Sequence, residues 1–234
     1  IKRKGVEHEF KIAIFDDTPA SWSAARNAHK GYGYDNKPFK NGSRVEGSHY
    51  PLLFLDPEKE DMKGANNDFR KEIYYYIWDA NLKPSFENVP RDYWFEIDGR
   101  PVILFWNPNG FLQDSYLSEL MKKDPVKYKS TTGLDETKSD AYHGKLSYIL
   151  KCISDDFNTT FGVRPFLIIQ REWTDRDYSL VDCPYLDGIH NWFAVPTMDM
   201  AEDVYNENLL YNTYISAYNF KGFSVGSGCP GFVQ

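Results

Sequence analysis

Five short apolar runs recur along the chain, and segments with helical periodicity separate them. The runs are Lys11–Phe15, Pro101–Trp106, Arg164–Gln170, Gly188–Phe193 and Gly222–Val225. Each run is largely apolar rather than alternating, which indicates strands buried on both faces. Alternation of such strands with helices predicts an α/β fold whose five strands are parallel neighbours in chain order, in one curved sheet.

Helices are predicted between the runs. Apolar residues at i, i+4, i+7 and i+8 predict a helix over Asn67–Ala80. Apolar faces or helical composition predict four more, over Ala20–His29, Gln113–Lys123, Ala141–Phe157 and Met200–Phe220. The polar stretches Gly31–Gly47 and Lys127–Ser139 are predicted to be loops, and Ile97–Arg100 a turn.

Polar and aromatic residues follow the strands at their C-terminal ends. They are Asp16 and Asp17, Trp106 and Asn107, Gln170, Glu172 and Trp173, and Asn191 and Trp192. A doubly wound sheet would concentrate such residues at one switch point, whereas a barrel builds its site from many strand ends. The distribution favours a (β/α)8 TIM barrel. Because five strands are too few to close one, we expect residues 1–234 to form a single barrel domain lacking N- and C-terminal parts.

The composition of the chain argues against some classes of binding partner. Net charge is −7 and no basic stripe is present, so we expect no nucleic-acid partner. The apolar runs are far shorter than a membrane-spanning helix needs, so we expect no membrane span. Aromatic residues make up 17% of the chain. They either fill the core or line a cleft for sugars, whose C–H faces pack on rings.

Several chemical motifs are absent or incomplete. The three cysteines and five histidines lack zinc-site spacing, so no metal is expected. Gly226–Gly231 matches a dinucleotide-binding pattern but contains Pro230 and is not followed by a helix, so no cofactor is expected. The Asp16–Thr18 segment lacks the D-x-D spacing of aspartyl phosphatases.

The remaining candidates for chemistry are carboxylates that stand near aromatic residues in the sequence. Glycosidic hydrolysis needs two carboxyl groups, and a neighbouring ring raises a carboxyl pKa by desolvation. We therefore predict Glu172 and Asp17 as catalytic. The predicted substrate-binding residues are Asp16, Trp106, Asn107, Gln170, Trp173 and Trp192.

Structural roles are the alternatives for these same residues. Asp17 would then be a helix N-cap, and Glu172 would pair on the surface with Arg171 or Arg176. Trp106 and Trp192 would lie in the core.

Three segments resemble one family. Tyr93–Trp106 is similar to the "idGkPvi" strand of endo-α-mannosidase-like glycoside hydrolases, Leu186–Ala194 to their "fDGvytYfa" strand, and Phe223–Phe232 to their "vPsvgPGy" segment. The order of the three matches, and Lys11–Trp22 falls where that family has a strand ending in a substrate-contacting acid.

The resemblance implies a glycoside hydrolase acting on a glycan or polysaccharide, secreted, periplasmic or at the cell surface. The family's main glutamate pair would lie beyond Gln234, and its earlier acid falls on Asp16 or Asp17, whose side chains are shorter than glutamate. The implied binding wall is Asp16 or Asp17, Trp106, Asn107 and Trp192. A non-catalytic carbohydrate-binding barrel and an unrelated α/β enzyme are the alternatives.

Overall fold

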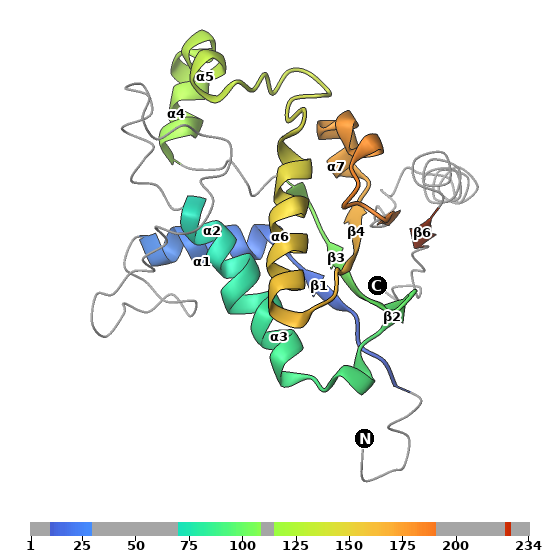
Figure 1. The fold of residues 1–234 in the computed structure, drawn as a ribbon. Helices are drawn as coiled ribbons and strands as arrows, with labels where there is room; N and C mark the ends of the chain where they lie inside the picture. Colours follow the sequence, from blue (N-terminus) through green and yellow to red (C-terminus); the bar gives the residue numbers. More distant parts are fainter. Residues whose placement is uncertain (1–9, 30–69, 109–114, 191–222, 226–234) are drawn as a thin grey trace, which may run out of the picture.

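Six strands form one sheet in the computed structural model, which describes residues 10–29, 70–108, 115–190 and 223–225 (Figure 1). The strands are β1 (Ile14–Asp16), β2 (Glu96–Ile97), β3 (Arg100–Phe105), β4 (Phe166–Gln170), β5 (Gly188–His190) and β6 (Ser224–Val225). Each predicted run overlaps one of five of them, β1 and β3 each reaching one residue beyond the predicted bounds, so the predicted strands are confirmed. Their outer parts, residues 191–193 and 222, lie outside the described residues.

The sheet order is β1-β3-β4-β5-β6, with every one of these pairs parallel. Parallel pairing in chain order is therefore confirmed. The order does not reverse, so the described strands contain no switch point of the doubly wound kind. In the described residues no helix is long and apolar enough to cross a membrane.

The sequence did not predict β2, which forms a hairpin with β3. Glu96 pairs with Pro101 and Ile97 with Arg100 in antiparallel register. The turn between them needs two positive φ angles, 52° at Asp98 and 71° at Gly99, and Asp-Gly is a sequence that adopts them readily. The predicted turn at Ile97–Arg100 thus joins two strands.

The helices largely follow the predicted periodicity. They are α1 (Thr18–His29), α2 (Arg70–Ile77), the π-helix η3 (Trp78–Leu82), α3 (Lys83–Asn88), the 3-10 helix η4 (Arg91–Tyr93), α4 (Ser115–Lys123), α5 (Pro125–Thr132), α6 (Lys145–Phe161), α7 (Glu172–Arg176) and the 3-10 helix η6 (Tyr178–Asp182). The predicted elements Gly31–Gly47 and Met200–Phe220 lie outside the described residues.

The predicted loop at Lys127–Ser139 is wrong in its first half, which belongs to α5. Asp124 caps this helix by accepting a hydrogen bond from the Lys127 amide at 3.0 Å, and Pro125 occupies its first turn. Gly133 ends it with a φ of 69°. The capping residues outweigh the polar composition that suggested a loop.

The prediction for α6 is displaced by one turn. Gly144 precedes the helix with a φ of 73°, so the helix begins at Lys145 rather than Ala141. At the other end it continues past Phe157 to Phe161, where Gly162 caps it with a φ of 73°.

The two faces of the sheet carry different neighbours. On one face Ile103, Leu167 and Ile189 pack against α2, α3, α6 and α7 in the main core. On the other face Val102, Phe166 and Ile168 form a second cluster, to which, within the described chain, only strand residues and Phe223 contribute. Figure 1 shows α6 and α3 on the same side of the sheet.

The sheet face against which no described helix packs is concave. The rings of Phe15 on β1 and His190 on β5 lie 6.2 Å apart, although three strand spacings of about 4.8 Å separate these strands. His190 Nε2 also lies 3.0 Å from the Phe105 carbonyl oxygen on β3, two strands away. Such short distances across strands require the sheet to curve toward this face.

A half-buried ion pair fixes the opposite, N-terminal edge of the strands. Arg100 binds Asp187 through two bonds, Nη1–Oδ1 at 2.7 Å and Nη2–Oδ2 at 2.6 Å. Asp187 also accepts from the Leu167 amide at 2.9 Å, and Arg100 donates to the Pro165 carbonyl. The pair therefore joins the starts of β3, β4 and β5.

Candidate functional site

The end of β1 places two adjacent carboxyl groups in different surroundings. Asp16 is fully buried, and by register it shares the helix-facing side with Phe105. Its Oδ2 accepts a hydrogen bond from Asn81 Nδ2 of η3 at 2.6 Å. Its Oδ1 has no partner among the described residues.

Burial raises the pKa of Asp16 to about 7. The Asn81 hydrogen bond lowers it and the neighbouring charge of Asp17 raises it, but desolvation is the largest effect. Asp16 is thus a buried carboxyl group that keeps its proton to a higher pH than an ordinary aspartate does.

Asp17 has the structural role that was the alternative to catalysis, that of a helix N-cap. It precedes α1, and its Oδ1 accepts from the Ala20 amide at 3.2 Å. This is the geometry of a helix N-cap, so one oxygen of the predicted catalytic Asp17 already has a backbone partner.

The end of β3 is tied to both neighbouring strands through its backbone. The Trp106 amide donates to the Asp16 carbonyl at 3.0 Å, and the Trp106 carbonyl accepts from Trp173 Nε1 at 2.9 Å. Thr18 Oγ1 donates to the Asn107 carbonyl. Trp106 and Asn107 are half-buried.

Trp173 lies in the core rather than on a wall open to sugar. It is fully buried, and its ring packs 5.9 Å from that of Phe105. The reason is that residues 172–176 form α7, which turns Trp173 toward the sheet. Trp173 thus supports the Trp106 carbonyl instead of presenting a ring to solvent.

Gln170 and His190 are neighbours on the concave face. They are register partners at the ends of β4 and β5, and their exposed fractions are only 4% and 6%. Gln170 Oε1 has no hydrogen-bond partner among the described residues. Since a carbonyl can only accept, His190 donates from Nε2 to Phe105, which fixes the neutral ring's proton on that nitrogen.

Glu172 begins α7 immediately after β4 and is exposed. Partial desolvation raises its pKa above the ordinary glutamate value, with a further contribution from the charge of Asp175. The surface pair expected as its alternative role is not formed, because Arg171 lies 3.7 Å from Asp175 and Arg176 lies 3.5 Å from Glu136.

The sequence did not predict three residues that lie at this edge of the sheet, namely Phe15, Asn81 and His190. Phe15 and His190 lie inside predicted strands, where apolar neighbours suggested core. Asn81 lies in a π-helix, and the switch from α- to π-helix has no simple sequence signal, although such segments are frequent at functional sites. Trp192 and Asn191 lie outside the described residues.

A second polar cluster, Asp140, His143 and Asp177, has its ligand atoms within 4.8 Å of one another. Its two carboxylates already accept hydrogen bonds from backbone amides. Asp177 accepts from the amides of Gly144 and Leu146, each at 3.0 Å, and Asp140 accepts from the Tyr178 amide at 2.8 Å. The cluster is therefore accounted for as capping of α6 and η6.

The buried Asp16 predicts a measurable dependence of stability on pH. Above about pH 4 the unfolded chain loses the Asp16 proton, whereas the folded chain keeps it until about pH 7. The folded state then binds more protons, so the free energy of unfolding falls as pH rises through this window, by up to roughly 4 kcal/mol. In the Asp16→Asn variant this contribution is absent.

Denaturant unfolding of both proteins between pH 4 and 8 measures the effect. Asp124→Asn is the matched control, because asparagine caps a helix as well as aspartate and Asp124 caps α5 without contributing to the pKa of Asp16. It should keep the wild-type pH dependence. Identical pH profiles for wild type and Asp16→Asn would contradict the assignment.

Comparison with known proteins gives one match. The model of the family described as domain of unknown function DUF5010 matches residues 1–234. No match was found to a curated protein or to a solved structure.

Proposed function

We propose that this chain, which belongs to the DUF5010 family, is a glycoside hydrolase domain that binds a glycan at the carboxyl ends of its parallel strands. The proposed architecture is a (β/α)8 barrel. Its support is the unreversed order of five parallel strands, the concave face and the helices gathered on the opposite face.

The observation that carries the proposal is the polar pair on the concave face. Gln170 presents a buried acceptor without a partner in the described chain, beside His190 and near the ring of Phe15. An unpaired buried acceptor is costly unless a ligand supplies the donor. A sugar hydroxyl supplies that donor, and the C–H face of the same sugar packs on an aromatic ring.

Glu172 is the proposed acid/base group. It lies at the end of the strand that carries Gln170, it is exposed, and its raised pKa suits a carboxyl that must hold a proton. Hydrolysis requires a second carboxyl group across the bond. Asp17 is less suited to that role than the sequence suggested, because it caps α1.

Non-catalytic carbohydrate binding is the second candidate, and one observation favours it. Of the three carboxyl groups at the ends of β1 and β4, Asp17 is engaged as a cap and Asp16 is fully buried on the helix side. Only Glu172 is exposed among these three.

A panel of polysaccharides tests the proposal, with α-mannan first because of the family resemblance. Release of reducing ends measures cleavage, and retardation in polysaccharide-containing native gels measures binding. We expect Gln170→Met to weaken binding roughly tenfold, because one hydrogen bond to the ligand is lost. The same change should not lower the free energy of unfolding, since it removes a buried acceptor that lacks a protein partner.

Asn158→Ala, an exposed amide on α6, serves as the matched control and should bind as wild type does. Wild-type binding by Gln170→Met would contradict the proposed site. Binding without cleavage across the panel would favour the second candidate.

A further inference from the structure

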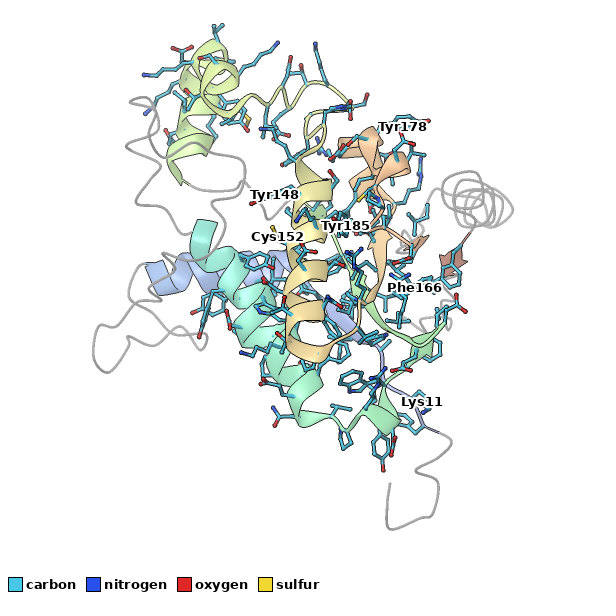
Figure 2. All side chains as sticks on the ribbon, viewed as in Figure 1. Lys11, Tyr148, Cys152, Phe166, Tyr178 and Tyr185 are labelled. Carbon is cyan, nitrogen blue, oxygen red and sulfur yellow. The ribbon has the colours of Figure 1, made fainter. Side chains whose placement is uncertain are left out.

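A groove on the helix-bearing side of the sheet has α6 as one wall, and η6 with the connection from η6 to β5 as the other. Its volume is about 430 Å³, within the range of small-molecule sites. The α6 wall includes Ser147, Tyr148 and Lys151, and the opposite wall includes Ser179, Asp182 and Tyr185. Figure 2 shows Tyr148 on α6 and Tyr185 beside that helix.

The two tyrosines have different neighbours. Tyr148 is 44% exposed on α6, and Cys152 lies one turn further along the same helix. The Arg164 guanidinium lies 5.5 Å from the centre of the Tyr185 ring. The groove therefore has an aromatic side chain on each of its two walls.

The charges around the groove balance. Lys151 pairs with Asp155 at 2.5 Å, and the exposed Asp182 faces the groove together with the positive Arg164 behind Tyr185. An anionic ligand would meet Asp182 and a cationic one would meet Lys151. A neutral ligand that both donates and accepts hydrogen bonds, and that has an apolar face for the rings, fits this surface.

We propose that this groove is a second carbohydrate-binding site, which holds a neutral sugar unit of the glycan bound at the strand ends. The choice of ligand rests on the proposed function. The link between the two sites is the connection from β4 to β5, which carries Glu172 at its start and Ser179, Asp182 and Tyr185 further on.

The test compares Tyr148→Ala with Tyr178→Ala in native gels containing α-mannan, xylan or a soluble β-glucan. Tyr178 is 66% exposed and does not line the groove, so it is a matched exposed tyrosine (Figure 2). We expect Tyr148→Ala to weaken retardation about threefold to tenfold on the polysaccharide that retards wild type. Tyr178→Ala should migrate as wild type, and cleavage of short oligosaccharides should be the same in all three proteins.

The outcomes separate this site from the one at the strand ends. If Gln170→Met weakens binding and Tyr148→Ala does not, the groove is overturned and the proposed function stands. If Tyr148→Ala weakens binding and Gln170→Met does not, the groove stands and the strand-end site is overturned. Absence of retardation and of cleavage on every polysaccharide overturns both.

Discussion

Replacing Asp187 by alanine is expected to lower the free energy of unfolding by about 2–4 kcal/mol. The change leaves Arg100 without its two-bond partner at a site where its side chain is 32% exposed. It also removes the acceptor of the Leu167 amide. An unpaired charge and an unpaired amide then remain at the junction of three strands.

Denaturant unfolding measures this loss, and the chain contains its own control. Arg91 and Glu96 form a pair at 3.1 Å in which the arginine side chain is 56% exposed. Because exposed pairs contribute at most about 1 kcal/mol, Arg91→Ala should have a small effect. Equal losses for Asp187→Ala and Arg91→Ala would show that the Arg100–Asp187 pair does not hold the strand starts together.

Local sequence patterns predicted the sheet because each strand lies in a short run of apolar residues. The runs around Ile103 and Ile168 are apolar on both faces, and only a parallel sheet covered on both sides buries such strands. The same reasoning placed polar residues at the C-terminal ends of the strands. Parallel strands in chain order bring those ends to one edge whatever the details of the helices.

The roles of individual site residues could not be predicted in the same way. Asp16 and Asp17 are adjacent and chemically identical, yet one is buried against η3 and the other caps α1. That difference depends on where β1 ends and α1 begins, and such boundaries shift by one or two residues. Trp173 was expected at a wall because it follows a strand, and α7 turns it into the core instead.

The motif residues of the family resemblance have roles that the resemblance did not assign. Asp187 and Gly188 belong to the segment similar to "fDGvytYfa", and Arg100 to the one similar to "idGkPvi". In the structure Arg100 and Asp187 pair with each other at the N-terminal edge of the strands. A Cβ on Gly188 would lie 2.6 Å from the Phe223 ring, so this position requires glycine for the close approach of β6. These three residues therefore stabilise the sheet, whereas His190 of the same segment lies beside Gln170 at the proposed site.

Replacing Glu172 by glutamine is expected to reduce turnover of a cleaved glycan by about a hundredfold or more, because a group that acts on the transition state is lost. The fold should be unaffected, since an exposed carboxyl group at a helix start contributes little to stability. Binding of the polysaccharide should remain, because glutamine keeps the size and polarity of glutamate. The expected pattern is thus a lower kcat with nearly unchanged retardation in native gels.

The pH profile provides the independent check on Glu172. A general acid must be protonated, so wild-type activity should fall as pH rises through the pKa of Glu172, which lies above the ordinary glutamate value. Asp175→Asn is the matched control on the same helix. It should keep activity and shift this limb of the profile to lower pH, because the Asp175 charge raises the pKa of Glu172. Full turnover by Glu172→Gln, with the wild-type pH profile, would remove Glu172 from the chemistry and leave glycan binding as the role of this edge.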